Sequence, residues 1–431
     1  MKLVWFSHFV PFPPRGGNLQ RSFNLIRQIS SSYEITLVAL NFFGEPPERL
    51  RSYIEELNQY CESVEIWELP YPWRGIRWWA ELLWSPLLDP PLSCHALFSG
   101  RTFSRWRQIL REHPGALLHF DSIDLALFAG AASSFRKVLN HHNCESAMAY
   151  RRARGESNPL KRAYLRVQAD KLATLERSLC GDFDMNLAVS EQDMKLLRVN
   201  APGAHIHIVE NGVDTQYFIP TSTKQERHSL IFTGSMDWYP NVSGLRFLVR
   251  EVWPRVKGKF RDARLYVAGK NPPKDVLQWP ESDSGIVVVA NPDDVRPWIA
   301  RSVVYVCPIL EGGGTRLKIL DAMAMAKPVV STAIGCEGLR VKHGENILVA
   351  DAPHEFADKV TQLIEDDELR HQLGCASRAL VEREYSWERI AHELEQAYRC
   401  ALEPETCDQR ARQCSRSGKV LSQEYGPAAS G

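Results

Sequence analysis

The sequence lacks the features that mark several common protein classes. Its 431 residues contain no uninterrupted apolar run of 18 or more, so we expect no membrane-spanning helix. Lysine plus arginine number 52, as do aspartate plus glutamate, and this zero net charge offers no general attraction to nucleic acid. No Gly-x-Gly-x-x-Gly follows the first apolar segment, which disfavours a dinucleotide-dependent dehydrogenase.

Cysteine pairs and targeting signals are also missing. The ten cysteines occur singly, without a Cys-x-x-Cys pair, and this pattern is typical of reduced thiols in the cytosol and argues against structural zinc. Pro11, Pro13 and Pro14 interrupt the first apolar segment too early for a signal peptide. We therefore expect a cytoplasmic protein, and peripheral contact at the inner membrane face stays open as an alternative.

The most informative segment is residues 308–324. An apolar strand at 303–306 leads into Gly312, Gly313 and Gly314, and a helix is expected to follow. Consecutive glycines let the backbone approach a ligand closely, and a helix N-terminus attracts anions. Arg316 and Lys318 are expected in the first turn, where helix electrostatics favours acids. This placement indicates a negatively charged ligand such as a diphosphate; a glycine-rich loop with solvated charges is the alternative.

The N-terminal half shows the pattern of a parallel sheet with crossover helices. A strand at residues 2–6 is followed by Gly16 and Gly17, a helix through residues 19–29 and a second strand at 35–40. In such sheets ligands bind beyond the carboxyl ends of the strands. The two glycines are therefore expected at a ligand-facing edge, with a plain turn after the prolines as the alternative.

Polar residues follow two further strands of this half. His119 lies at the end of residues 117–120, and His142 and Glu145 follow residues 138–140. Because both strand ends should face one cleft, these three are candidates for acid, base or hydroxyl recognition. Structural hydrogen bonding is the alternative for each. Residues 151–180 are expected to form one long surface helix.

A second strand–helix series begins near residue 230, and the boundary between two domains is expected between 196 and 222. Helices are expected at residues 355–365, 368–373 and 378–384. Ser386 is expected to cap a last helix whose apolar face carries Trp387, Ile390, Leu394 and Tyr398. The strands are expected at residues 230–233, 264–268, 285–290, 303–306, 328–331 and 347–350.

Residues 71–92 are rich in tryptophan, with Trp73, Trp78, Trp79 and Trp84 beside scattered arginines. This composition suits a membrane interface or an apolar acceptor groove. We favour a helical insertion packed on the core, because basic residues are few.

Four segments together resemble the retaining glycosyltransferases of family 4 (glycosyl transferases group 1), which have the GT-B fold. They are Gly16-Gly17, residues 210–214, Gly234 with Pro240-Asn241, and residues 312–332, and the resemblance covers about residues 1–402. It implies an α/β architecture of two facing Rossmann-like domains, each a doubly wound parallel sheet, with a cleft between them. The implied division is an acceptor-binding domain at 1–200, a nucleotide-sugar-binding domain at 201–385, a helix at 386–402 that crosses back, and a disordered tail at 403–431.

The resemblance implies a transferase that moves a sugar from a nucleotide-diphosphate donor to a glycan or lipid-linked acceptor, as in polysaccharide biosynthesis, without a metal or other cofactor. The tryptophans of residues 71–92 keep peripheral membrane contact open as a further partner, and the zero net charge gives no reason to expect nucleic acid. The implied catalytic residues are Lys318, Arg316 and His142. The implied donor-binding residues are Gly16, Gly17, Gly234, Gly312, Gly313, Gly314, Thr315 and Asp321, and the acceptor-side or sugar-contacting residues are His119, Glu145 and Glu311.

The sequence departs from the family pattern at two places. Members commonly carry Glu-x7-Glu here, but Asp321 occupies the second acidic position, Gly313 lies eight residues before it, and Glu311 lies ten residues before it. The arginine that often follows the first glycine of the second domain is Ser235 in this chain, so Arg316 is expected to substitute for it. A sugar-nucleotide 2-epimerase and a non-catalytic binding protein of the same fold remain alternatives.

Overall fold

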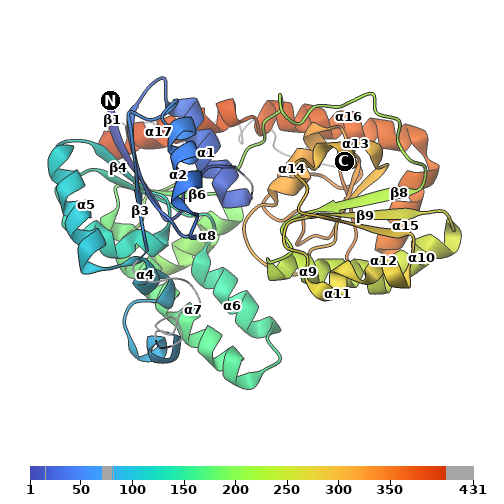
Figure 1. Ribbon diagram of the computed structural model, residues 1–431, viewed down its shortest axis with the longest axis horizontal. Coiled ribbons are helices and arrows are strands. Elements are labelled where there is room, and N and C mark those ends of the chain that lie inside the picture. The colour runs from blue at the N-terminus through green and yellow to red at the C-terminus, as the bar shows by residue number, and fades with distance from the viewer. Residues whose placement is uncertain (15, 70–79, 81, 404–431) are drawn as a thin grey trace, which may run out of the picture.

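The computed structural model describes residues 1–14, 16–69, 80 and 82–403, which form two parallel-sheet α/β domains (Figure 1). The N-terminal sheet has seven strands in the order β3-β2-β1-β4-β5-β6-β7. Every neighbouring pair is parallel. The strands are β1 (Lys2–Ser7), β2 (Glu34–Leu40), β3 (Ser63–Trp67), β4 (Leu117–Phe120), β5 (Lys137–Asn140), β6 (Met185–Ala188) and β7 (Ile206–Ile208).

Both faces of this sheet are covered, which explains its nearly continuous apolar strands. Leu3 and Trp5 of β1 pack in one core with α1 (Gly17–Ile29), whereas Val4 and Phe6 pack in the other with α5 (Gly100–Glu112). The remaining helices of this half are α2 (Pro47–Leu57), α4 (Leu92–Leu97), the 3-10 segment η2 (Ile123–Ala132), α6 (Glu145–Gly155), α7 (Pro159–Leu179) and α8 (Glu191–Asn200).

The C-terminal sheet has six parallel strands in the order β10-β9-β8-β11-β12-β13. They are β8 (Ser229–Thr233), β9 (Arg264–Gly269), β10 (Ile286–Ala290), β11 (Val304–Cys307), β12 (Val329–Ser331) and β13 (Leu348–Val349). Figure 1 shows α13, α14 and α16 above this sheet and α9 to α12 below it. The helices are α9 (Tyr239–Phe247), α10 (Trp253–Lys259), α11 (Lys274–Leu277), α12 (Trp279–Ser282), α13 (Arg296–Arg301), α14 (Leu317–Ala324), α15 (Pro353–Glu365), α16 (Asp367–Glu384) and α17 (Trp387–Leu402).

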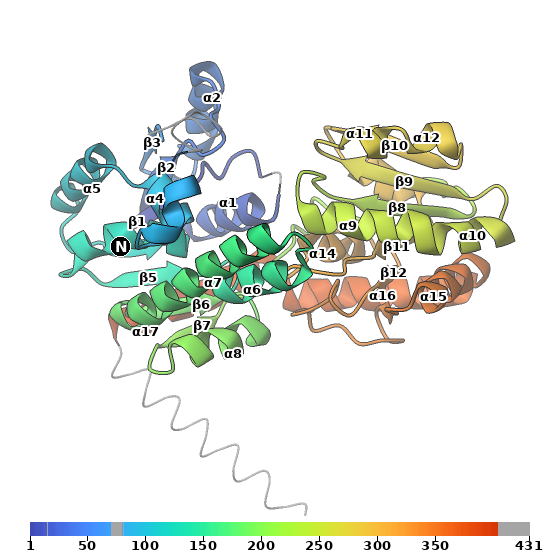
Figure 2. The ribbon, with the colours of Figure 1, turned by 90° about the horizontal axis from the view of Figure 1, so that it is seen from below.

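Two chain crossings join the domains. The first follows β7, and the second lies between α16 and α17, where the Val213 amide donates to the Tyr385 carbonyl at 2.7 Å. A Cβ on Gly212 would lie 2.8 Å from the Trp387 ring, so the two crossings pack closely. From there α17 returns to the N-terminal domain, where Tyr398 hydrogen bonds to His119 at 2.8 Å (Figures 1 and 2).

The predicted strands are confirmed within one or two residues at each end, and the Ser386 cap of α17 is confirmed by its bond from the Arg389 amide. Two helix predictions are wrong. Residues 151–180 contain the end of α6 and the whole of α7, which are separate helices because Asn158 caps α7 and Pro159 occupies its first position. The predicted helices at 368–373 and 378–384 are one helix, α16.

Residues 70–79, 81 and 404–431 lie outside the described residues, and with them three of the four tryptophans of the tryptophan-rich segment, Trp73, Trp78 and Trp79, and nearly all of the predicted tail. Described residues 82–88 lie against α7 through a contact of 3.0 Å between Ser85 Oγ and Tyr164 Oη. Within the described part of the chain, no helix combines the length and the apolarity that a membrane crossing needs.

Candidate active site

The carboxyl ends of β8 and β11 lie side by side at the centre of the C-terminal sheet. β8 pairs with β9 on its other side, and β11 pairs with β12. The connections that follow β8 and β11 therefore lead to strands on opposite sides of this point. Such a topological switch point is where open parallel sheets bind ligands. Gly234 follows β8 and the loop of residues 308–316 follows β11, so the fold brings these predicted donor-binding segments together.

The glycine triplet forms a loop whose carbonyl groups are held by two arginines. Gly312 and Gly314 have φ values of +110° and +68°, which only glycine adopts readily. Arg316 donates to the carbonyl oxygens of Gly313 and Gly314, and Arg151 of α6 donates to that of Gly312 at 2.9 Å. Arg316 is thus the N-cap residue of α14 and is fixed on its own loop, in contrast to the predicted mobile charge in the first turn.

This arrangement leaves a row of backbone amides free. In a trans peptide the carbonyl and the next amide point in opposite directions. The amides of Gly313, Gly314 and Thr315 therefore point away from the two guanidinium groups, and they donate no hydrogen bond to another described residue. Successive free amides of this kind form an anion-binding concavity.

Lys318 supplies a positive charge in the first turn of α14. Its Nζ donates to Asn241 Oδ1 at 2.7 Å and lies 4.2 Å from the centre of the Phe232 ring. A Cβ on Gly234 would lie only 2.4 Å from this Nζ, so glycine is needed there to make room for the ammonium group. Burial lowers the pKa of Lys318 to about 8, which shows how little this charge is compensated in the free protein.

Asp321 lies one turn after Lys318 on the same side of α14. Its carboxyl group forms no hydrogen bond or ion pair with any other described residue, and burial raises the pKa of this group to about 8 although Lys318 opposes the shift. The side chain is therefore available to a ligand. Thr315 is already engaged, because its Oγ1 accepts from Asn211 Nδ2 at 2.6 Å and ties the loop to the crossing after β7.

Two predicted segments of the N-terminal domain face this loop. Gly16 precedes α1, and a Cβ on Gly17 would lie 3.5 Å from the Leu317 side chain, so the N-termini of α1 and α14 approach each other. A Cβ on Gly314 would lie 3.2 Å from the carbonyl oxygen of His142. Gly17 thus lies close to the start of α14, and the backbone of His142 lies close to the glycine triplet.

The His142 ring is held by a buried polar network that sequence reasoning missed. Its Nε2 lies 2.9 Å from the Asp121 carbonyl oxygen, and Nδ1 has no partner among the described residues. The Asp121 carboxylate accepts from Ser22 and Asn140 at 2.5 and 2.8 Å. Although burial opposes ionisation, His119 and His142 hold the pKa of Asp121 well below its usual range. The sequence signal for this network was Asp121, the polar residue directly after β4.

The other three predicted residues take different positions. His119 is fully buried, stacked on Trp5 at 3.7 Å, so the fold does not bring it to the cleft. Burial raises the pKa of Glu145 to about 8, and the carboxyl accepts from Asn143 Nδ2 at 3.1 Å. Glu311 lines a groove along α9 beside the glycine triplet.

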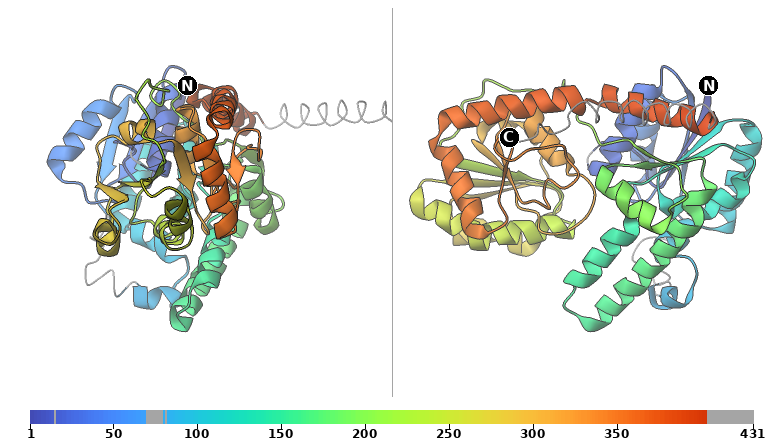
Figure 3. Two further views of the ribbon diagram at one scale, coloured as in Figure 1. Left: turned by 90° about the vertical axis from the view of Figure 1, so that its right-hand side faces the viewer. Right: turned by 180° about the vertical axis from the view of Figure 1, so that it is seen from behind.

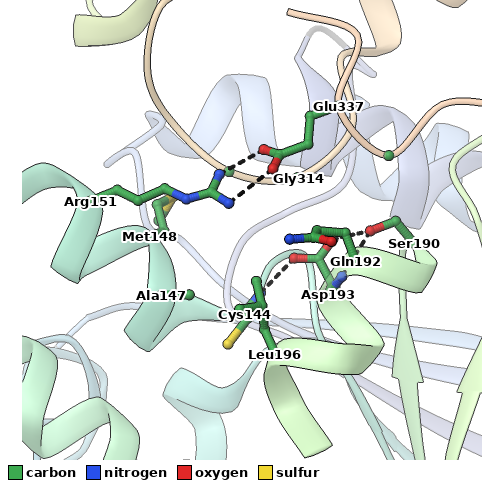
Figure 4. Close-up of a pocket in the computed structure, with 12 residues that line it drawn as sticks. Cys144, Ala147, Met148, Arg151, Ser190, Gln192, Asp193, Leu196, Gly314 and Glu337 are labelled. Carbon is green, nitrogen blue, oxygen red and sulfur yellow. Dashed lines mark hydrogen bonds and ion pairs between the residues drawn. The ribbon is translucent and has the colours of Figure 1, made fainter. Parts of the chain in front are cut away.

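The two domains meet through an ion pair that no sequence pattern indicated. Arg151 of α6 contacts both carboxylate oxygens of Glu337, at 2.6 and 2.9 Å (Figure 4). The pair borders a narrow interdomain pocket lined by Met148 and Gly314 as well. Within the described part of the chain, no group of three or more His, Cys, Asp or Glu could hold a metal ion. Metal independence itself stays a prediction.

Comparison with known proteins gives consistent matches over both domains. Residues 16–217 match the family model "Glycosyltransferase Family 4", and residues 227–366 match "Glycosyl transferases group 1". An uncharacterized 44.6 kDa protein in the cps region of Klebsiella pneumoniae is 26% identical over 401 residues, which cover 90% of this chain and 97% of that protein.

Solved structures share the fold at low sequence identity. Sucrose-phosphate synthase from Thermosynechococcus elongatus superposes with a TM-score of 0.72 at 15% identity, covering 94% of this chain and all of the other. Anabaena HepE in complex with UDP superposes with a TM-score of 0.63 at 13% identity, covering 92% and 99%.

Proposed function

This chain is a glycosyltransferase of the GT-B fold, and on that basis we propose that it transfers a sugar from a nucleoside-diphosphate donor with retention of anomeric configuration. The proposed acceptor is a glycan or a lipid-linked glycan. The UDP bound to HepE and the cps-region location of the Klebsiella relative support a nucleotide sugar and a role in polysaccharide biosynthesis. The cytoplasmic location predicted from the sequence is part of this proposal.

The observation that carries the proposal is that one loop–helix junction after β11 holds both the Lys318 ammonium group and the backbone amides of Gly313, Gly314 and Thr315, which donate to no other described residue. Negative charge develops on the diphosphate as the bond to the sugar breaks. Donors already aimed at that charge lower the barrier, by about 3 kcal/mol for each well-placed donor. The ammonium and the amides would then do the work that a metal ion does in other transferases, which is why we propose metal independence.

Further roles follow from the side chains that have no partner. Asp321 is the proposed acceptor for the ribose hydroxyl groups, since its carboxyl group is removed from solvent and forms no hydrogen bond or ion pair with other described residues. His142 is proposed to orient the acceptor hydroxyl through its free Nδ1. A retaining reaction on one face of the sugar needs no strong protein base, because the donor phosphate can take the proton.

The direct test is turnover of the purified chain with a panel of nucleoside-diphosphate sugars in excess EDTA. Release of the nucleoside diphosphate is measured, and the anomeric configuration of the product is read by NMR. We expect turnover of at least one donor with retention, and a loss of about 100-fold in Lys318→Ala. Inversion, a requirement for added metal, or near-normal turnover in Lys318→Ala would each contradict the proposal.

A further inference from the structure

The α6–α7 hairpin extends below both sheets in the view of Figure 1, while α6 contacts the C-terminal domain, where the Arg152 guanidinium lies 5.1 Å from the centre of the Tyr239 ring. Figures 1 and 3 show its end, residues 152–166, and the segment of residues 82–88 extending on the same side of the molecule. The segment lies against α7, where Lys171 Nζ donates to the Ser85 carbonyl oxygen at 2.5 Å and Ser85 Oγ contacts Tyr164. We name residues 82–88 and 152–166 together the hairpin end.

The hairpin end exposes large apolar side chains. Leu83, Trp84 and Leu87 are 76%, 62% and 77% exposed, and Leu160 is 81% exposed. Leu160 lies one turn before Tyr164, on the face of α7 that carries the segment. Soluble proteins rarely cluster such residues on a projecting surface without a partner.

The charge around these apolar groups indicates the partner. Residues 152–166 contain five basic residues and one acidic residue, a net charge of +4 in a chain whose total is zero. Each of these five basic residues is exposed. Tryptophan and leucine beside arginine and lysine favour the boundary between lipid head groups and acyl chains, where anionic lipids add electrostatic attraction.

We propose that the hairpin end docks on an anionic lipid bilayer. α6 runs along the glycine loop into the hairpin end: a Cβ on Gly313 would lie 3.4 Å from Met148, and a Cβ on Gly155 would lie 3.4 Å from the Glu311 carboxylate. Docking therefore holds the active site close enough to the bilayer to reach the head group of a lipid-linked acceptor. The reach to a lipid-linked acceptor rests on the proposed function, whereas the docking itself does not.

The test is flotation of the full chain with vesicles of phosphatidylcholine, alone or mixed with phosphatidylglycerol. We expect binding to the mixed vesicles that weakens as salt rises, and little binding to phosphatidylcholine alone. Trp84→Ser with Leu87→Ser should weaken binding at least about tenfold. Arg154→Glu with Arg162→Glu should do the same by removing electrostatic attraction.

A matched control changes the same kinds of residue on α8. Val199 is 80% exposed and follows exposed Arg198, so Arg198→Glu with Val199→Ser should bind vesicles as the unmodified chain does. Donor hydrolysis in solution should be unchanged in all three variants. Absence of vesicle binding with intact hydrolysis would overturn the docking proposal alone. A change of oligomeric state in the Trp84 variant, without an effect on vesicle binding, would show a contact between chain copies and would also overturn it.

Discussion

Substitution of Gly234 by alanine tests how the lysine is held. The new Cβ would lie 2.4 Å from Lys318 Nζ and 3.0 Å from Asn241 Nδ2. The ammonium must move by about 1 Å to restore an ordinary contact near 3.4 Å, and that movement strains its hydrogen bond to Asn241. The substitution removes no charge, so any loss of turnover reports the position of the Lys318 ammonium group alone.

The expected effect is large on turnover and smaller on stability. A 1 Å misplacement of a catalytic group costs on the order of 100-fold in rate, or about 2.7 kcal/mol of transition-state stabilisation. The fold is affected less, because the displaced atom is the end of a flexible side chain. The φ of +152° at Gly234 adds strain of about 1–3 kcal/mol to the alanine variant.

The assay is release of nucleoside diphosphate from the donor, with thermal unfolding measured on the same samples. Gly258→Ala in α10 is the control, because a Cβ there meets no atom within 4 Å, and its turnover should be unchanged. The double variant Gly234→Ala with Lys318→Ala should be no slower than Lys318→Ala, since both substitutions act through one ammonium group. Additive losses, or normal turnover in Gly234→Ala, would refute this reasoning.

Three further predictions concern charge in the same region. Because the pKa of Lys318 is about 8 in the free protein and a bound diphosphate keeps it protonated, affinity for nucleoside diphosphates should fall up to about tenfold per pH unit above pH 8, and calorimetry of Lys318→Met should lose this dependence. Arg151→Ala should lower kcat/KM for the donor more than Glu337→Ala does, because only Arg151 contacts the Gly312 carbonyl; equal losses would assign the effect to the ion pair alone. Glu145→Gln should keep its turnover at pH 7, because a carboxyl group with a pKa of about 8 is already neutral there, and a large loss would indicate a catalytic base.

Sequence reasoning predicted the two sheets because buried parallel strands appear as apolar runs bounded by turn residues. It also predicted the strand–loop–helix junction that carries the glycine triplet and Lys318, because one short segment holds them all. It could not find the roles of Asn241 or Arg151, whose decisive contacts join residues 77 and 161 positions apart. The Asn241 contact forms only when the domain folds, and the Arg151 contact forms only when the two domains come together.

His119 shows a different limit. It lies near a strand end, as His142 does, and was therefore expected at the same cleft. Side chains alternate along β4, however, and the register beside Trp5 turns His119 toward α17, where Tyr398 bonds to it. When both faces of a strand are buried, both are equally apolar. The sequence of such a strand therefore does not indicate the face on which a polar residue lies.

We propose that the glycine triplet and Lys318 bind the diphosphate of the donor. Isothermal calorimetry in EDTA with nucleoside diphosphates and the matching monophosphates tests it most directly. We predict that at least one diphosphate binds at least about tenfold more tightly than its monophosphate, and that Lys318→Ala removes most of this difference. Equal affinity for the two ligands, or an unchanged difference in Lys318→Ala, would contradict the account.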